Sequence, residues 1–221
     1  MKKNKNLTLV FLPGLGADAR LFVRQQNAFK KIIIPQWLPP FQNESLAAYA
    51  RRWAGELRLP QGCILVGISF GGMLALEMAP LVMPKCVLLI GSCRSPSSIP
   101  WVLKMVGRLP GWPALGKILA RTLPFGRGWF LGVDRKEDLD LLMKMYLDAP
   151  NSFLQWTVRA ILSWKGYAGK GTKIYHIHGT NDRLIPFRNV KPDAVVQGGG
   201  HTIVLSHPKE VNAFIKRCMG R

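Results

Sequence analysis

The chain has 221 residues, of which 31 are Lys or Arg and 12 are Asp or Glu, so its formal net charge is +19. Hydrophobic residues make up 48% of the chain, a fraction too high for intrinsic disorder. No apolar run approaches the about 18 residues that a membrane-spanning helix requires. The length suits one large domain or two small ones, and the composition predicts a soluble globular protein with an unusual positive charge.

The cysteines bear on the cellular compartment. Cys63 and Cys86 lie within apolar runs, and no cysteine has the C-x-x-C spacing of a metal or redox site. We therefore expect reduced, buried thiols and a cytoplasmic location. The lysine-rich start MKKNKN before LTLVFL resembles a signal peptide. The short apolar run is equally consistent with a buried strand, and cleavage at Ala17-Asp18-Ala19 would remove a glycine-rich loop discussed below, so we favour the strand.

Short apolar runs bounded by Gly and Pro alternate with segments of helical character along the chain. In chain order, the predicted strands are Leu7–Leu12, Lys31–Ile34, Cys63–Ile68, Cys86–Ile90, Lys173–Ile177 and Ala194–Gln197. The predicted helices are Ala19–Phe29, Ser45–Leu57, Phe70–Met78 and His207–Met219. This alternation is typical of an α/β fold, in which helices cover both faces of a mostly parallel, doubly wound sheet of about six strands.

The segment 94–168 interrupts the alternation. It is rich in Pro, Gly, Trp, Leu and Met and contains no strand-like run. We interpret it as a helical cap inserted into a core formed by residues 1–93 and 169–221. No acid occurs between Pro80 and Val133. The basic residues of that stretch are Lys85, Arg94, Lys104, Arg108, Lys117, Arg121 and Arg127.

The strongest local pattern is GISFGG, with Ser69 at its third position. It has the form G-x-S-x-G and lies between the predicted strand Cys63–Ile68 and the helix that follows. Glycines two residues before and after the serine let the strand and the helix approach each other. The turn lifts the hydroxyl clear of the sheet, at the positive end of the helix. The pattern predicts Ser69 as a nucleophile, with a structural glycine turn as the alternative.

A serine nucleophile needs a base, and the base needs a carboxylate to orient it. His201 follows three glycines just after the last predicted strand, where a flexible loop can carry its imidazole over the sheet edge. Asp182 lies in the loop after the fifth predicted strand, although Asn-Asp is also good turn chemistry. The resulting order is Ser69, Asp182, His201. For His176 and His178 we expect structural roles and no metal site, because no third ligand accompanies them.

Acyl transfer also needs hydrogen-bond donors for the oxyanion. The first predicted strand ends in the loop LPGLG. If this strand neighbours the strand before Ser69, the backbone N–H groups of Leu15 and Phe70 point into one space. A dinucleotide-binding turn is the alternative, but GLGADA lacks the third glycine of G-x-G-x-x-G and the acid expected about 20 residues later. We expect no cofactor.

Together these segments resemble the α/β-hydrolase superfamily, in particular its small serine esterases with a helical cap. The resemblance rests on FLPGLGADARLF, LVGISFGG, HIHGTNDRLIP and GGGHTIVLSHPKEV, which occur in the family's order. It implies Ser69 as the nucleophile, His201 as the base and Asp182 as the partner of the histidine. It also implies the Leu15 and Phe70 amides as the oxyanion hole, and it places the middle insertion where the family has its lid.

Three features depart from the family pattern. Pro13-Gly14 stands where the family usually has His-Gly before the oxyanion residue. The similarity starts at the family's third strand, without counterparts of its two leading antiparallel strands. The stretch between Asp182 and His201 leaves little room for the usual helix. None of these features involves the reacting groups, and together they predict a reduced core.

We therefore predict a serine hydrolase that cleaves carboxylic esters or thioesters through an acyl-enzyme. Alternatives on the same fold are a lyase, a perhydrolase, a carbon–carbon bond hydrolase and a non-catalytic binding module. The presence of all three triad residues argues against the binding module. Aromatic residues of the cap are candidates for an apolar acyl pocket, or for packing the cap onto the core. They are Trp101, Trp112, Phe125, Trp129 and Phe130.

The basic cap has two interpretations. It is either an ordinary solvated surface or a face for an acidic partner. The partner would be an acidic carrier protein that delivers an acyl group, as the resemblance to the family allows, or an anionic membrane surface. We do not expect nucleic-acid binding, because no binding motif accompanies the charge.

Overall fold

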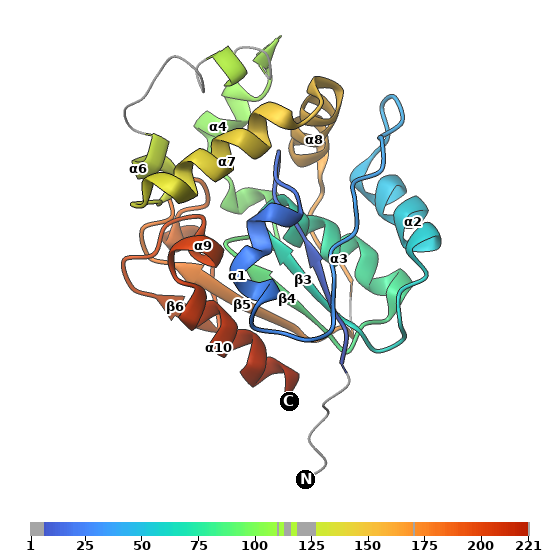
Figure 1. The fold of residues 1–221 in the computed structure, drawn as a ribbon. Helices are drawn as coiled ribbons and strands as arrows, with labels where there is room; N and C mark the ends of the chain where they lie inside the picture. The colour runs from blue at the N-terminus through green and yellow to red at the C-terminus, as the bar shows by residue number, and fades with distance from the viewer. Residues whose placement is uncertain (1–6, 110, 113–115, 119–126, 170, 221) are drawn as a thin grey trace.

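The fold is built on a six-stranded, all-parallel sheet with the order β2-β1-β3-β4-β5-β6 (Figure 1). The computed structural model describes residues 7–109, 111–112, 116–118, 127–169 and 171–220. The strands are β1 (Leu9–Leu12), β2 (Ile32–Ile33), β3 (Ile64–Ile68), β4 (Cys86–Ile90), β5 (Ile174–Gly179) and β6 (Ala194–Val196). The predicted fold class is therefore confirmed, and each predicted strand forms.

Helices cover both faces of the sheet. The side chains of β1 show the division: Val10 and Leu12 join one apolar cluster with α2 and α3, whereas Leu9 and Phe11 join another with α9 and α10. Strands buried on both faces need apolar residues at successive positions, which explains the continuous apolar runs in the sequence. The helices of the two layers are α1 (Val23–Gln26), α2 (Leu46–Leu57), α3 (Phe70–Val82), α9 (Ile203–Ser206) and α10 (Pro208–Met219).

The carboxyl ends of the parallel strands meet at one edge of the sheet. The register pairs Ile68 of β3 with Ile90 of β4, and Ile90 in turn with Ile177 of β5. The loops that follow these strands therefore leave the sheet on the same side, which is where ligands bind in open α/β sheets. All three predicted triad residues follow a strand at this edge: Ser69 comes directly after β3, Asp182 three residues after β5 and His201 five residues after β6.

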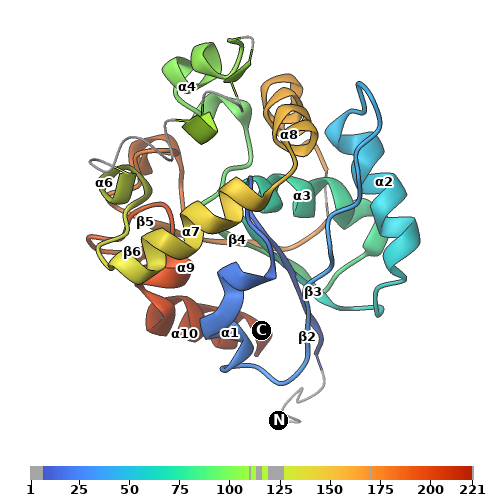
Figure 2. The ribbon, with the colours of Figure 1, turned by 45° about the horizontal axis from the view of Figure 1, so that its top comes forward.

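The segment between β4 and β5 forms helices above this edge, and Figure 2 shows α7 crossing over the ends of the strands. Its described residues contain no strand. The boundaries of the cap at 94 and 168 stay a prediction. The helices are α4 (Trp101–Val106), α6 (Arg127–Leu131), α7 (Lys136–Asp148) and α8 (Asn151–Ser163), and the short turns are η2 (Pro96–Ser98) and, between β5 and β6, η3 (Phe187–Asn189).

An aromatic cluster fixes α8 to the sheet layers below it. The Trp156 ring lies 4.3 Å from the Tyr49 ring of α2 and 5.8 Å from the Phe70 ring of α3, measured between centroids. Its Nε1–H donates to the Glu44 carbonyl oxygen at 2.7 Å. The cap aromatics singled out in the sequence do not include Trp156, so this anchoring contact was missed.

The predicted helix Ala19–Phe29 is shorter and less regular than expected. A 3-10 turn, η1 (Ala19–Phe22), leads into the short α1. The backbone N–H groups of Ala28 and Phe29 both donate to the Gln25 carbonyl oxygen, at 2.9 and 3.1 Å. These bonds close the helix and turn the chain toward β2, which has only two residues.

The cysteines are free and buried. Burial raises the pKa of the Cys63 thiol to about 11 and the pKa values of Cys86 and Cys93 to about 12. These thiols therefore stay protonated and unreactive near neutral pH. Within the described ranges, no helix has the length and apolar character needed to cross a membrane.

Candidate active site

Ser69 occupies a strained turn between β3 and α3. Its φ of 51° and ψ of −120° lie outside the conformations that non-glycine residues favour. The strand and the helix approach closely on either side of it. A Cβ atom at Gly67 would lie 2.4 Å from the Gly71 oxygen, and one at Gly71 would lie 2.1 Å from the Leu12 oxygen. Only glycine fits at these two positions, which explains the G-x-S-x-G pattern.

Hydrogen bonds with β4, with the loop that follows it and with α3 hold the strained turn. The Ser69 N–H donates to the Ile90 carbonyl oxygen at 3.2 Å. The Ser69 carbonyl oxygen accepts from the buried Ser92 hydroxyl at 2.7 Å and from the Gly72 N–H at 2.9 Å. Ser92 is a supporting residue that the sequence analysis missed, because nothing local distinguishes it from the other serines of GSCRSPSS.

His201 and Asp182 are joined by a short, buried hydrogen bond. The Nδ1 atom of His201 lies 2.8 Å from Oδ2 of Asp182. The other carboxylate oxygen of Asp182 accepts from the N–H groups of Leu184 and Ile185, at 2.9 and 2.8 Å. Burial alone would raise the pKa of Asp182, but the charge and hydrogen bond of His201, with a hydrogen bond from His178, hold it well below its ordinary value. The carboxylate is therefore ionised at neutral pH.

A second histidine contacts the same carboxylate. The Nε2 atom of His178 lies 3.1 Å from Oδ2 of Asp182 and 2.8 Å from the Ile185 carbonyl oxygen. Both neighbours are acceptors, so Nε2 carries the proton and Nδ1 accepts from Nε2 of His176, 3.0 Å away. Burial and the neighbouring His178 lower the pKa of His176 to about 3. The two histidines are hydrogen-bonded, and the contact of His178 with Asp182 was not anticipated.

The loop after β1 lies beside the Ser69 turn. A Cβ atom at Gly14 would be 3.4 Å from the Ser69 Cβ, and Leu15 lines the same cavity as Ser69. Phe70 is the first residue of α3, so its N–H belongs to the helix end that has no intrahelical acceptor. Helix α7 packs on this loop, because a Cβ atom at Gly16 would lie 2.7 Å from the Tyr146 ring. The role of the two amides as an oxyanion hole stays a prediction.

A cavity of about 570 Å³ opens between this loop, the triad loops and the cap helices. Ser69 and His201 both line it. The rest of its wall is mostly apolar and comes largely from the cap. Its apolar side chains include Leu103, Trp112, Leu131, Leu142, Val158 and Ile161. The arrangement can hold an extended apolar group with one end at the serine.

The predicted pocket aromatics divide into two groups. Trp112 and Phe130 line the cavity. Trp101 and Trp129 do not, and they are 74% and 65% exposed. The Trp129 ring instead lies 3.8 Å from the Arg183 guanidinium carbon, measured at the ring centroid. Phe125 lies outside the described residues.

The basic residues of the cap do not act as one group. Lys104 lines the cavity. Lys117 caps the end of α7, donating to the Leu147 and Ala149 carbonyl oxygens at 2.9 and 2.6 Å. Arg94 lies 3.9 Å from an Asp193 oxygen. Arg121 and the side chain of Arg127 lie outside what the structure describes.

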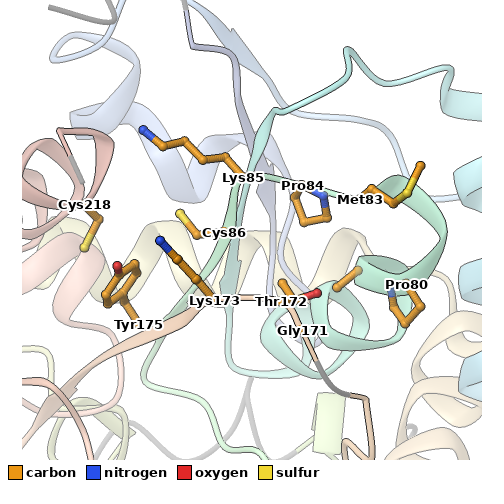
Figure 3. Close-up of a pocket in the computed structure, with 11 residues that line it drawn as sticks. Pro80, Met83, Pro84, Lys85, Cys86, Gly171, Thr172, Lys173, Tyr175 and Cys218 are labelled. Atoms are coloured by element: carbon orange, nitrogen blue, oxygen red, sulfur yellow. The ribbon is translucent and has the colours of Figure 1, made fainter.

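A second cavity, of about 510 Å³, lies at the amino ends of β4 and β5 (Figure 3). Lys85 and Lys173 are among its lining residues, and the Lys85 ammonium donates to the Met219 carbonyl oxygen at 2.9 Å. None of the three predicted triad residues contributes to this cavity. Among the residues that the structure describes, no group of three or more His, Cys, Asp or Glu side chains could hold a metal ion.

Comparison with known proteins bears on the family. A family model described as the alpha/beta hydrolase family matches residues 9–214. No curated protein matches the sequence significantly.

Three solved structures illustrate the likeness in fold. An esterase from Exiguobacterium antarcticum has a TM-score of 0.73 and 16% identity, over 98% of this chain and 92% of that chain. A bromoperoxidase from Bacillus anthracis has a TM-score of 0.72 and 17% identity, over 98% and 93%. A meta-cleavage product hydrolase from Pseudomonas fluorescens IP01 has a TM-score of 0.67 and 17% identity, over 96% and 90%. At these identities the likeness shows the fold.

Proposed function

Because the chain belongs to the alpha/beta hydrolase family, we propose that it is a serine hydrolase of carboxylic esters or thioesters. Ser69 is the nucleophile, His201 the general base and Asp182 the residue that orients the histidine. The observation that carries the proposal is the buried 2.8 Å hydrogen bond between Asp182 and His201, beside a cavity that His201 and Ser69 share. Similarity to esterases in fold supports it.

The hydrogen bond to Asp182 determines which nitrogen of His201 acts. An ionised carboxylate only accepts, so Nδ1 carries the proton and Nε2 is left as the base. Nε2 takes the proton of the Ser69 hydroxyl as its oxygen attacks the substrate carbonyl. The imidazolium then returns that proton to the leaving group, and an acyl-enzyme remains. In the second step His201 takes a proton from water as the water attacks the acyl-enzyme, and it returns that proton to the Ser69 oxygen as the acyl group leaves.

The developing oxyanion needs donors that are in place before the reaction. The N–H of Phe70 is free of an intrahelical acceptor at the start of α3, and Leu15 lies in the loop that runs beside Ser69. In the proposed mechanism these two amides bind the oxyanion. Loss of one such donor typically costs about 10²–10³ in kcat.

Hydrolysis of p-nitrophenyl esters from acetate to laurate tests the proposal. The wild type should hydrolyse them and Ser69→Ala should not, while Ser163→Ala, at an exposed serine on α8, should match the wild type. A fluorophosphonate probe should add its mass to the peptide with Ser69 in the wild type only. Ester hydrolysis that survives in Ser69→Ala would exclude Ser69 as the nucleophile.

The same assay separates the proposal from other chemistry on this fold. The similar folds include a bromoperoxidase and a meta-cleavage product hydrolase, so the fold alone does not select ester cleavage. Labelling of Ser69 without turnover of any ester or thioester would favour another triad reaction. The absence of both labelling and turnover would favour a binding module.

A further inference from the structure

Helix α4 turns one charged side chain, Lys104, toward the apolar cavity beside Leu103 and Val106, while three of its apolar side chains face solvent. Trp101, Val102 and Met105 are exposed, at 74%, 49% and 53%, and none of them lines the cavity. Lys104, the only charged residue of α4, is partly buried and lines the cavity, as does the neighbouring Leu103. A helix in this position ordinarily turns apolar side chains inward and charged ones toward water. Lys104 departs from that rule, because it lines an apolar cavity while Trp101, Val102 and Met105 are exposed.

Among the residues that the structure describes, Lys104 is also the only Lys, Arg, Asp or Glu that lines the cavity. The ammonium group of Lys104 forms no ion pair or hydrogen bond with another residue that the structure describes. The stretch from Pro80 to Val133 contains no acid that could neutralise it. An ammonium group in a mostly apolar cavity is costly unless an anion pairs with it. The described residues supply no such anion for Lys104.

The charge of Lys104 acts on the pKa of a buried thiol, Cys93. The buried Cys93 thiol follows β4, and two charges act on its pKa, which burial raises to about 12. The Lys104 ammonium lowers this pKa, and the Asp182 carboxylate raises it. Both charges therefore lie within electrostatic range of one buried thiol.

We propose that Lys104 binds a carboxylate carried by the substrate, so that the preferred ester is anionic, with its carboxylate separated from the scissile carbonyl by an apolar chain. This inference rests on the proposed function of the same site. In this proposal the apolar walls hold the chain, and the Lys104 ammonium binds the carboxylate by a charge-assisted hydrogen bond. The carboxylate can belong to the acyl group, as in a hemiester of a dicarboxylic acid, or to the leaving group.

Matched substrates test the proposal. The first arm compares p-nitrophenyl hemiesters of dicarboxylic acids, from adipate to sebacate, with p-nitrophenyl alkanoates of the same carbon number. The second arm compares hexanoate esters of 4-hydroxybenzoate and of phenol. In at least one arm the wild type should have the higher kcat/KM for the anionic ester. Lys104→Met keeps the length of the side chain but removes its charge, and it should lower kcat/KM for that ester by about tenfold or more.

The controls separate charge recognition from general damage to the cap. Lys104→Met should change kcat/KM for the neutral esters by less than about threefold. Lys144→Met, at an exposed lysine of α7 outside the cavity, should change neither class. Equal losses for anionic and neutral esters in Lys104→Met would overturn the inference, as would a wild-type preference for neutral esters in both arms.

A binding experiment keeps this inference distinct from the proposed function. Ser69→Ala is titrated calorimetrically with monomethyl suberate, and so is the double variant with Lys104→Met. Binding to the first and at least tenfold weaker binding to the second would support Lys104 as the carboxylate site even if no ester is turned over. No binding to Ser69→Ala, or equal binding to both, would overturn the inference while leaving ester hydrolysis as a separate result.

Discussion

The Nδ1 atom of His201 lies 2.8 Å from Oδ2 of Asp182, with both side chains buried. The same carboxylate also accepts from two backbone N–H groups, and Nε2 of His178 contacts it as well. These contacts hold the Asp182 carboxylate in place from the β5 side. The hydrogen bond from Nδ1 of His201 then fixes the orientation of the imidazole on the neighbouring loop. In the proposed mechanism the base is therefore oriented before any substrate binds, which is the arrangement that lowers the cost of reaching the transition state.

Asp182→Asn should retain the fold and lose most of the activity. The amide oxygen can still accept from the N–H groups of Leu184 and Ile185, but the amide nitrogen cannot accept from His201. The imidazole is then held in the wrong tautomer, and kcat should fall by about 10⁴. Steady-state kinetics with p-nitrophenyl butyrate measure this loss, with Asp134→Asn, at an exposed acid, as the control. A fall of less than about tenfold would rule out the assigned role of Asp182.

Two glycine substitutions should have opposite effects on stability. In Gly71→Ala the new Cβ would lie 2.1 Å from the Leu12 oxygen and 2.3 Å from the Pro13 oxygen, so β1 and α3 must separate. We expect a loss of more than about 4 kcal/mol in the free energy of unfolding. Gly55 lies within α2 with no atom within 4 Å of an added Cβ. Gly55→Ala should therefore stabilise the protein by about 0.5–1 kcal/mol. Urea denaturation checks both, and a stable Gly71→Ala would contradict the close packing of the elbow.

Much of the fold and the outline of the candidate site could be predicted from the sequence, because both depend on local patterns. A fully buried strand such as β3 needs apolar residues at each position, and the turn at Ser69 needs glycine on both sides. The order Ser69, Asp182, His201 follows from placing one loop after each of three parallel strands. The structure brings Asp182 and His201 into contact, as the loop positions predict.

The supporting residues could not be predicted, because their roles depend on how the strands pair and how the loops turn in three dimensions. Ser92 reaches the Ser69 carbonyl oxygen only through the β3–β4 register, and His178 reaches Asp182 only after the loop turns back. The side that a cap helix presents to the cavity is set by packing. Trp101 and Trp112 therefore look equivalent in the sequence, and only Trp112 lines the cavity.

As the pH is lowered, we expect the protein to lose stability before the pH reaches the range in which ordinary carboxylates titrate. The buried His176 has a pKa of about 3 in the folded protein, below its ordinary value of 6.5. The unfolded chain therefore binds a proton below about pH 6.5 that the folded protein rejects until about pH 3, so stability falls as the pH drops through this window. Asp182, whose pKa is also lowered, adds a loss at still lower pH.

The contribution of His176 can be isolated by substitution. Its share of the stability lost between pH 7 and pH 5 is about 2 kcal/mol by proton linkage. His176→Gln keeps a hydrogen-bond donor for His178 but has no titrating group, so this share should vanish. Urea denaturation at the two pH values measures the difference, with His207→Gln, at a partly exposed histidine, as the comparison. An unchanged pH dependence in His176→Gln would show that His176 is not buried in its neutral form.

Two cap tryptophans should differ in their effect on chain-length preference. Trp112 lines the cavity, so Trp112→Ala enlarges it and removes apolar contact with a bound acyl chain. The optimum in kcat/KM across p-nitrophenyl esters should shift to longer acyl groups, with about a tenfold loss on the ester that the wild type prefers. Trp101 is 74% exposed and outside the cavity, so Trp101→Ala should keep the wild-type optimum. A shift in Trp101→Ala and none in Trp112→Ala would place the acyl group elsewhere. Because both residues lie in the cap, a general loosening of the cap would change the chain-length preference of both variants in the same way. Only the assignment of Trp112 to the cavity wall predicts that the two variants differ.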